Sequence, residues 1–260
     1  ILSRIFSSLI KKSLGLSKSR ICITGAASIP KSTLKWFDRF KIKIYEAYGM
    51  SENSACSHGN YPGNIKFGTV GKAMPDTDIK ITDKGEVIMK NDCIMKGYYK
   101  EEELTKQTIK KGYLHTGDKG TIDDDGYLTI TGRIKDIFKT SKGKYVAPNP
   151  IEMKLSKNNL IEQVCVVGEN LTQPIALVVM NETKKIADDI KNNFEALIDS
   201  INNKLEKHER IKKIVILKDS WSIENNILTP TMKIKRNVVE EKYKEFYEYW
   251  FNSKNQIIFQ

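Results

Sequence analysis

Alternating apolar and polar positions predict a strand–helix–strand unit near the start of the chain. Residues 20–24 (RICIT) form a short apolar run that ends at the small residues GAAS. A helix is expected to begin at Ser28 or Ser32 and to run through Phe40, and residues 42–47 predict a second strand. In α/β sheets ligands gather at the carboxyl ends of the strands, so the segments that follow both strands are candidates for a site.

The pattern changes twice further along the chain. Between residues 66 and 131, short strand-like runs separated by Gly- and Asp-rich turns indicate a β-rich subdomain, with strands at 78–82, 86–89 and 128–131 and a helix near 101–109. The remainder predicts a small α+β unit, large enough for its own core, with helices at 151–156, 194–208 and 237–249 and strands at 163–167, 174–180 and 213–217.

Residues 1–14 are amphipathic and predict a helix with one apolar face. A membrane-surface helix and a transit peptide both have this pattern. Because the first residue is Ile1 and not methionine, we favour a core-facing helix that enters partway through a longer protein.

Composition excludes several classes of protein. Hydrophobic residues make up 40% and charged residues 29% of the 260, which is typical of a globular chain, and no apolar run approaches the ~20 residues of a membrane span. The four cysteines and three histidines are dispersed, so neither a zinc site nor a disulfide scaffold is expected. A reducing compartment such as the cytoplasm is the expectation.

The net charge of +11 comes almost entirely from scattered lysines, since only six of the 43 basic residues are arginine. Nucleic-acid binders more often carry a basic stripe with arginine and stacking aromatics. We therefore expect a lysine-rich surface that favours solubility, and we expect no nucleic-acid partner. The positive charge is also compatible with binding of phosphate-bearing small molecules.

Four motifs in order carry the chemistry. They are YGMSE at 48–52, GYLHTGD at 112–118, GRIKD at 132–136 continuing to KGKYVAP at 142–148, and LTPTMKIKR at 228–236. This series resembles the carboxyl-terminal half of the adenylate-forming (AMP-binding) enzymes over about residues 20–240. Its details are most similar to long-chain fatty acid–CoA ligases.

The resemblance implies a fold of mixed class, α/β and α+β. Residues 1–134 would form the end of the large AMP-binding domain, with an α/β portion at 1–62 and a β-rich subdomain at 63–134. Residues 135–260 would form the small mobile carboxyl-terminal domain, with a hinge at Lys135.

The first motif offers groups that suit a nucleotide. Tyr48 and Gly49 present an aromatic face beside an unobstructed backbone, Ser51 supplies a hydroxyl, and Glu52 is a hard carboxylate of the kind that Mg²⁺ selects. The resemblance places Tyr48 on adenine, Ser51 on the α-phosphate and Glu52 on Mg²⁺ with a catalytic role. Taken alone, the pentapeptide is more typical of a plain strand-to-loop turn.

Two further residues would bind the ribose. Asp118 follows a Thr-Gly pair that we expect to form a turn, where a carboxylate accepts hydrogen bonds from hydroxyls. The resemblance assigns Asp118 and Arg133 to the ribose, and it places Gly25 and Ala26 beside the nucleotide and the acyl group. The alternatives are a turn-capping aspartate, a surface cation and a small-residue loop. The spacing from the TGD motif to the GR motif matches the pattern of the family that the chain resembles, and this match favours the functional interpretation.

Lys233 is the expected catalytic residue. A lysine late in a mobile domain can place its positive charge on the carboxylate and α-phosphate oxygens as charge redistributes. Lys235 competes for the role, because the family's usual Gly-Lys pair is Met232-Lys233 here, and an alternating exposed edge is the other interpretation. Gly143 would border the CoA channel, whereas Lys139 is more typical of a solvated lysine.

The implied reaction uses ATP with Mg²⁺ to convert a fatty acid to acyl-AMP, and CoA then displaces AMP. The family's phosphate loop lies upstream in relatives and does not occur in this sequence, so we expect an inactive partial site. The alternatives are an adenylation domain that loads a carrier protein and a non-catalytic nucleotide-binding module. Peripheral membrane contact of the full-length protein and the oligomeric state stay open.

Overall fold

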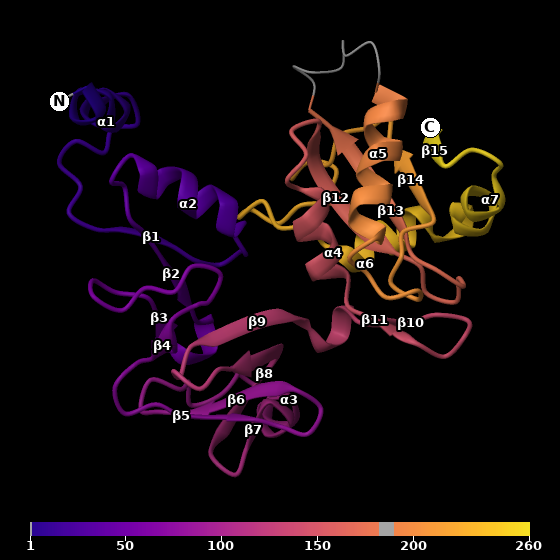
Figure 1. Cartoon of the computed structure of the whole chain (residues 1–260). Coiled ribbons are helices and arrows are strands. Elements are labelled where there is room, and N and C mark those ends of the chain that lie inside the picture. The colour runs from indigo at the N-terminus through magenta and orange to yellow at the C-terminus, as the bar shows by residue number, and fades with distance from the viewer. Residues whose placement is uncertain (1, 182–189) are drawn as a thin grey trace. The chain divides into compact units, whose positions relative to one another are not determined.

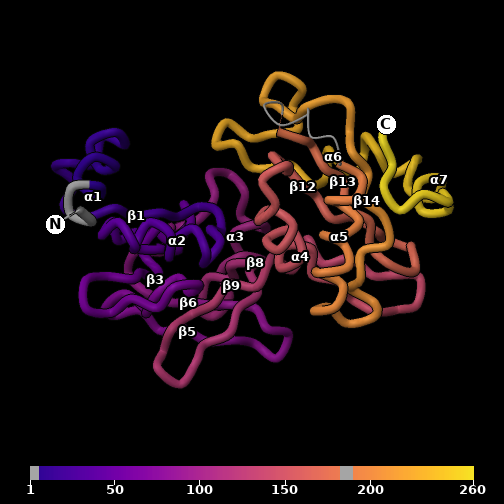
Figure 2. Tube along the Cα trace, turned by 45° about the horizontal axis from the view of Figure 1, so that its top comes forward, coloured from indigo at the N-terminus to yellow at the C-terminus, as the bar shows by residue number. Residues whose placement is uncertain are grey.

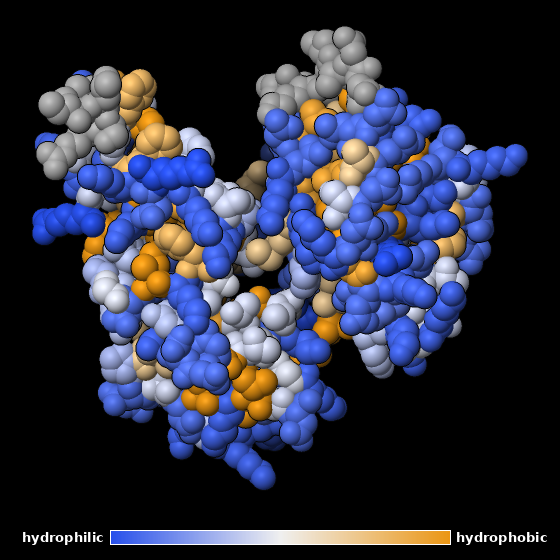
Figure 3. All heavy atoms as spheres, viewed as in Figure 1, coloured by the Kyte–Doolittle hydropathy of each residue, from blue (hydrophilic) through white to orange (hydrophobic). Residues whose placement is uncertain are grey.

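The computed structural model describes residues 2–181 and 190–260, with side chains from Phe6 onward. The chain divides into two compact units, Ile1–Thr131 and Gly132–Gln260, which are described separately below (Figure 1). Among the described residues, no helix combines the length and the apolar character that a bilayer crossing requires. Hydrophilic residues cover most of the face of each unit seen in Figure 3, as the scattered lysines predict.

The first part of unit 1 is an α/β layer. Its sheet has the order β1-β2-β3-β4, with β1 and β2 parallel and the other neighbours antiparallel. The elements are α1 (Leu2–Ser13), β1 (Cys22–Thr24), α2 (Lys31–Arg39), β2 (Ile44–Tyr48), β3 (His58–Gly59) and β4 (Lys72–Ala73). Leu34 of α2 is buried, which fits the predicted apolar helix face.

The second part of unit 1 is the predicted β-rich region. Its sheet has the order β5-β6-β8-β7, and β9 also pairs with β8. The elements are β5 (Asp78–Ile81), β6 (Glu86–Lys90), α3 (Glu102–Thr108), β7 (Ile109–Lys110), β8 (Tyr113–Ile122) and β9 (Leu128–Arg133). Val87, Met89, Leu114 and Leu128 form its buried core.

Unit 2 has a mixed sheet, β12-β13-β14-β15, between two apolar layers. The strands are β12 (Ile161–Val167), β13 (Ile175–Met180), β14 (Lys213–Ile216) and β15 (Ile257–Phe259), and Figure 2 shows the first three side by side. Alternate residues of β13 face opposite layers: Val178 packs with α4 (Pro148–Leu155) and α5 (Ile190–Asn202), and Leu177 packs with α6 (Arg236–Tyr243) and α7 (Tyr247–Asn252). A separate hairpin joins β10 (Phe138–Lys139) to β11 (Tyr145–Val146).

Three predicted helices differ from the structure. Helix α5 ends at Asn202 and not at 208, because the Asn202 side chain exchanges hydrogen bonds of 3.0 and 2.8 Å with the backbone of Ile211. The single helix expected at 237–249 is two helices, α6 and α7, separated by a 3₁₀ turn at Lys244–Phe246. In α1, Phe6 and Leu9 are 61% and 56% exposed, so no described residue of this chain covers the apolar face of the helix, and the expectation that it faces the core of a longer protein stays a prediction.

Candidate nucleotide site

Parallel pairing of β1 with β2 brings two predicted segments to the same sheet edge. Cys22 pairs with Ile44 and the register continues to Thr24 beside Glu46, so Gly25 follows its strand at the level of Ala47, one residue before Tyr48. A Cβ on Gly25 would lie 3.0 Å from the carbonyl oxygen of Ala47, so this position favours glycine. The following Ala26 has a φ of 67°, which turns the chain sharply away from the strand.

The loop after Tyr48 folds back tightly on itself. A Cβ on Gly49 would come within 2.5 Å of the Ala55 backbone, which no side chain could accommodate. Between them lies a 3₁₀ turn, η1 (Ser51–Asn53), and the side chain of buried Asn53 accepts a 2.9 Å hydrogen bond from the Met50 N–H. This turn presents Ser51 and Glu52 directly beyond the end of β2.

Tyr48 and Asp118 meet although they are 70 residues apart in sequence. The Tyr48 hydroxyl donates a 2.6 Å hydrogen bond to Asp118 Oδ2, and Asp118 is buried. The expected turn before Asp118 is wrong, since the residue lies within strand β8. The strand is irregular here: Gly117 has a φ of 70° and the register with β6 shifts, so a β-bulge takes the place of a turn.

The sequence analysis missed Tyr98. Its hydroxyl donates a 2.7 Å hydrogen bond to Glu52 Oε1, and the N–H of Met95 donates to the Glu52 carbonyl oxygen at 2.8 Å. Residues 91–98 therefore hold Glu52 through both its side chain and its backbone. Tyr98 follows the apolar pair Ile94-Met95 in an irregular segment, and no motif in the sequence connects it with position 52.

His58 lies beside Tyr48 in the neighbouring strand. The two residues are paired across β2 and β3, and their ring centroids are 6.3 Å apart. His58 is 1% exposed and its Nδ1 lies 2.8 Å from the Ser57 hydroxyl, and burial lowers its pKa to about 4. The imidazole is therefore neutral at physiological pH. Burial likewise raises the pKa of Glu46, which accepts a hydrogen bond from the Gly68 N–H.

Three of the predicted residues lie in unit 2 near its beginning. Arg133 is exposed at the end of β9, and Lys135 is exposed in the 3₁₀ turn Ile134–Asp136. Gly143 has a φ of 76° in the turn that joins β10 to β11, and its N–H donates to the Thr140 carbonyl oxygen at 2.9 Å. The glycine there is required by the turn itself, apart from any contact with CoA.

The loop that carries Lys233 is closed by its own hydrogen bonds. The Thr229 N–H donates to the Lys233 carbonyl oxygen at 2.8 Å, and the Lys233 N–H donates to Thr229 Oγ1 at 3.0 Å. Met232 lies at the apex with a φ of 62°, a backbone conformation that favours glycine. Lys235 donates a 2.5 Å hydrogen bond to Asn226, whereas within the described part of unit 2 the Lys233 ammonium has no such partner.

A largely buried ion pair that the sequence analysis missed anchors this loop; both side chains are 16% exposed. Arg236 Nη2 lies 2.6 Å from Glu152 Oε1, and Arg236 Nη1 donates to the Val166 carbonyl oxygen at 2.7 Å. The same Glu152 oxygen accepts the Val166 N–H at 2.7 Å. The residue three positions after Lys233 is thus fixed to both α4 and β12.

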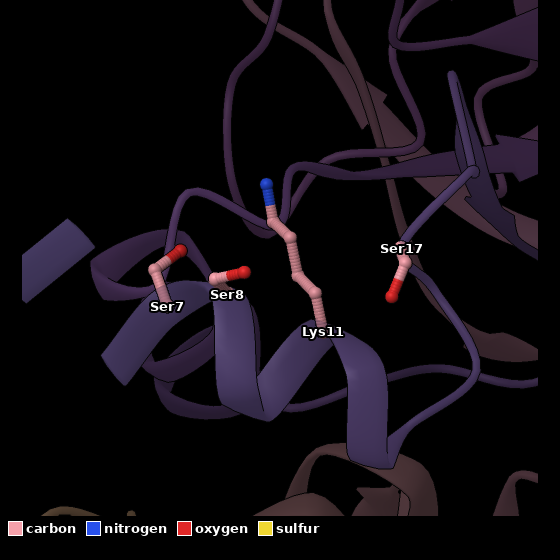
Figure 4. Close-up of a pocket in the computed structure, with 4 residues that line it drawn as sticks. All are labelled: Ser7, Ser8, Lys11 and Ser17. Carbon is pink, nitrogen blue, oxygen red and sulfur yellow. The ribbon is translucent and has the colours of Figure 1, made fainter. Parts of the chain in front are cut away.

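Two surface hollows of unit 1 lie away from these residues. Figure 4 shows one of about 250 Å³ lined by Ser7, Ser8, Lys11 and Ser17. A second, of about 230 Å³, lies beside it between α1 and the start of β2. Neither is lined by Tyr48, Asp118 or the Glu52 loop.

Two family models match the chain in order. The AMP-binding enzyme model matches residues 2–99, and the model of the AMP-binding enzyme C-terminal domain matches residues 135–254. The chain belongs to the AMP-binding enzymes. This confirms the resemblance drawn from the four motifs.

Curated relatives and solved structures agree with this AMP-binding assignment. The chain is 31% identical to the long-chain-fatty-acid–CoA ligase FadD15 of Mycobacterium bovis, over 98% of this chain and 45% of that protein. The ATP-bound structure of MatB from Rhodopseudomonas palustris is 26% identical and superposes with a TM-score of 0.72, over 88% of this chain and 46% of MatB. The structure of the anthranilate CoA ligase AuaEII is 23% identical and superposes with a TM-score of 0.75, over 92% of this chain and 48% of that protein, which shows a shared fold.

The chain spans less than half the length of these relatives. The mixed α/β and α+β class expected from the sequence is confirmed by the fold of the AMP-binding neighbours. The AMP-binding motifs thus lie on a fold that belongs to the family, across both units.

Proposed function

We propose that the chain acts as the carboxyl-terminal part of a long-chain fatty acid–CoA ligase. The reaction would join a fatty carboxylate to the α-phosphate of ATP, with release of pyrophosphate, and then transfer the acyl group to the thiol of CoA, with release of AMP. The relatives named as fatty-acid–CoA ligases support this choice of substrate. The longer protein, and not this chain alone, would carry the activity.

The single observation that carries the proposal is the Tyr48–Asp118 hydrogen bond. It joins the residue expected to stack on adenine to the residue expected to bind the ribose. A carboxylate accepts several hydrogen bonds through its two oxygens, so Asp118 can orient the Tyr48 ring and accept ribose hydroxyls together. In the proposed site, this contact would set the distance between the base and the sugar of the nucleotide.

Around this pair, Gly25 and Ala26 would border the nucleotide at the same sheet edge, and Ser51 would donate to the α-phosphate. Arg133, from the next motif, would add a second contact to the ribose. In unit 2, Gly143 would border the CoA channel and Lys135 would serve as the hinge between residues 1–134 and 135–260. Rotation about a few backbone bonds there would exchange the groups that face the acyl-adenylate.

Glu52 fits a magnesium ion that arrives with its nucleotide. Among the described residues, no group of three or more His, Cys, Asp or Glu side chains could hold a metal by itself. Mg²⁺ is commonly bound through one or two carboxylates together with substrate phosphates, and Glu52 beyond β2 supplies one such carboxylate. When bound, the ion would offset phosphate charge. Tyr98 would keep the Glu52 carboxylate oriented toward it.

Lys233 would supply the positive charge for adenylate formation. Its loop is closed by hydrogen bonds, its ammonium has no hydrogen-bond partner among the described residues of unit 2, and Lys235 is bound to Asn226. These contacts favour Lys233 over Lys235 for a group that must reach a substrate. Glu152 and Arg236 would hold the base of the loop in place during the domain rotation.

The experiment compares Lys233→Ala with Lys235→Ala in the full-length protein, measured by acid-dependent exchange of pyrophosphate into ATP. Loss of one charge contact to the reacting phosphate costs on the order of 10²–10³ in rate, so Lys233→Ala should fall by that factor while Lys235→Ala retains most activity. The opposite ranking would assign the role to Lys235. No loss in either variant would overturn the proposal that this loop is catalytic.

Two further assays define the substrate and the limits of the chain. Thioester formation with CoA, compared with a carrier protein as the acceptor, separates a CoA ligase from a carrier-loading adenylation domain. We expect this chain alone to form no acyl-CoA from ATP, CoA and palmitate. Turnover by the chain alone would show that the upstream phosphate loop is not needed.

A further inference from the structure

Two loops of unit 1 that are far apart in sequence, residues 51–56 and 91–95, lie side by side and are joined by hydrogen bonds. The Asn91 side chain donates a 2.8 Å hydrogen bond to the Cys56 carbonyl oxygen, and the Ser54 hydroxyl donates to the Cys93 carbonyl oxygen at 3.2 Å. Together with the bond from Met95 to Glu52, these contacts join residues 51–56 to residues 91–95 at three points. Both backbones are therefore fixed relative to one another.

Each loop carries a cysteine at this junction. The Cys56 thiol neighbours that of Cys93 and raises the pKa of Cys93. Cys56 Sγ itself donates a 3.4 Å hydrogen bond to the Ser54 carbonyl oxygen, and the Ser54 hydroxyl donates to the Cys93 carbonyl oxygen. Cys93 is exposed and Cys56 is half-buried, and both are free thiols in the structure. The Cys93 N–H is held by the Asn91 side chain at 3.1 Å, so the backbone of the exposed cysteine is also ordered.

We propose that Cys56 and Cys93 are a redox-active pair that forms a reversible intramolecular disulfide. The oxidant is a small disulfide such as glutathione disulfide. Cys93 loses its proton to solvent, and its thiolate attacks one sulfur of the oxidant. The sulfur–sulfur bond of the oxidant breaks, a mixed disulfide forms on Cys93, and one glutathione leaves as a thiolate that takes up a proton. Cys56 then loses its proton, and its thiolate attacks Cys93 Sγ, which breaks the mixed disulfide and releases the second glutathione in the same way. Two protein thiols are oxidised and one glutathione disulfide is reduced.

The other two cysteines have different surroundings and serve as internal controls. Cys165 is fully buried, with Arg236 Nη1 at 3.2 Å from its sulfur. Cys22 lies 3.3 Å from the Ser19 hydroxyl. Selective loss of Cys56 and Cys93 would therefore reflect their apposition and not a general reactivity of the chain.

The disulfide would act on the loop that carries Glu52. Residues 91–98 already hold Glu52 through Met95 and Tyr98. A covalent link from Cys93 to Cys56 would attach the same segment a second time, four residues after Glu52. A cross-link restricts motions that hydrogen bonds alone permit. Oxidation would thus change the freedom of the Glu52 loop without a change of fold.

The test is differential alkylation and peptide mapping of the 260-residue chain after equilibration in glutathione buffers of increasing oxidising strength. Trypsin leaves Cys56 in residues 44–66 and Cys93 in residues 91–96. We expect these two peptides linked to each other, two hydrogens lighter than their sum, and a fall from four alkylatable thiols to two. Addition of dithiothreitol should restore all four.

Three results would overturn the proposal: separate glutathione adducts on Cys56 and Cys93 that do not resolve, a disulfide between two chains, or four thiols that stay alkylatable in the most oxidising buffer. Cys56→Ser provides the matched control, because it should trap the mixed disulfide on Cys93 and abolish the linked peptide. Cys56→Ser, and the Cys93→Ser variant used below, each replace one sulfur by oxygen, and near-ultraviolet and far-ultraviolet circular dichroism verifies their folding.

Nucleotide affinity supplies a second readout that separates this inference from the proposed function. ATP affinity of the full-length protein is measured before and after oxidation. If the linked peptide forms, and oxidation changes the ATP affinity of the wild type but not that of Cys93→Ser, the pair acts on the Glu52 loop. If the full-length protein does not bind ATP, the proposed function fails while the linked peptide still establishes the redox pair.

Discussion

The buried His58 makes the stability of unit 1 depend on pH. In the unfolded chain its pKa returns to about 6.5, whereas burial in the folded protein lowers the pKa to about 4. Above pH 6.5 both states are neutral at this side chain and it contributes nothing to the pH dependence. Below it, only the unfolded state binds the proton, so stability falls as the pH falls, until the folded pKa is reached.

The magnitude follows from the two pKa values. Each unit of difference corresponds to 1.36 kcal/mol, so the free energy of unfolding should drop by about 3 kcal/mol between pH 6.5 and pH 4 because of His58 alone. Glu46 in the same unit acts in the opposite direction, since its raised pKa favours proton binding by the folded state as the pH falls. A single pH profile would therefore mix the two effects.

His58→Gln isolates the histidine, because it removes the titration and retains a polar side chain while Glu46 is unchanged. Urea unfolding of unit 1, followed by NMR signals from residues 44–73, is measured for both proteins between about pH 7.5 and about pH 4.5. The difference between wild type and variant should change by about 1.4 kcal/mol per pH unit below pH 6.5. The two other histidines, His115 and His208, remain in the variant, so the missing imidazole signal is that of His58.

A flat difference between the two profiles would refute this reasoning. So would an imidazole titration of His58 with a midpoint near 6.5, since it would mean that the proton reaches the ring without unfolding. Either result would show that water enters the space between β2 and β3. The contact of His58 with Tyr48 would then be looser than the structure describes.

The remaining predictions concern single contacts. Tyr98→Phe removes a hydrogen bond to a carboxylate and should lower the urea stability of unit 1 by about 1–2 kcal/mol, whereas Tyr99→Phe, at an 87% exposed position, should change it little. Arg236→Met leaves the largely buried Glu152 carboxylate without its partner and should lower the free energy of unfolding of unit 2 by about 3–5 kcal/mol. Adding Glu152→Gln to this variant should restore much of the lost stability. If the destabilisation of the double variant equals the sum of the two single effects, the pairing is contradicted. Lys213→Met removes the donor to the carbonyl oxygens of residues 253 and 255, at 2.6 and 2.8 Å, and should loosen β15, measured as faster amide exchange of residues 257–259; unchanged exchange would contradict this role.

Local pattern predicted the elements whose sequence preference and packing agree. The apolar runs at 78–82 and 174–180 became β5 and β13, and the charged segment at 101–109 became α3. The final helix shows the limit of such reasoning. Its periodicity continues past Tyr243, but the chain turns at 244–246 so that Tyr247 and Trp250 reach the same core as Tyr243. Periodicity along one segment does not show where the chain must turn for later residues to reach the same core.

For the candidate site too, some features could be predicted from the sequence and others could not. The order and the spacing of the motifs identified the family and named Tyr48, Asp118 and Lys233, because those groups must occur in sequence whatever the surrounding packing. The sequence did not reveal that Asp118 lies on a bulged strand, that Tyr98 holds Glu52, or that Arg236 is fixed by Glu152.

The sequence by itself determined the chemical groups of this protein and their order along the chain, since strand ends, glycine turns and charged motifs are local properties. Only the tertiary structure decided which groups touch. A hydrogen bond over 70 residues, such as that from Tyr48 to Asp118, depends on strand register and on one bulge. Register is fixed by the packing of the whole sheet, and a shift of one residue would turn the carboxylate to the opposite face.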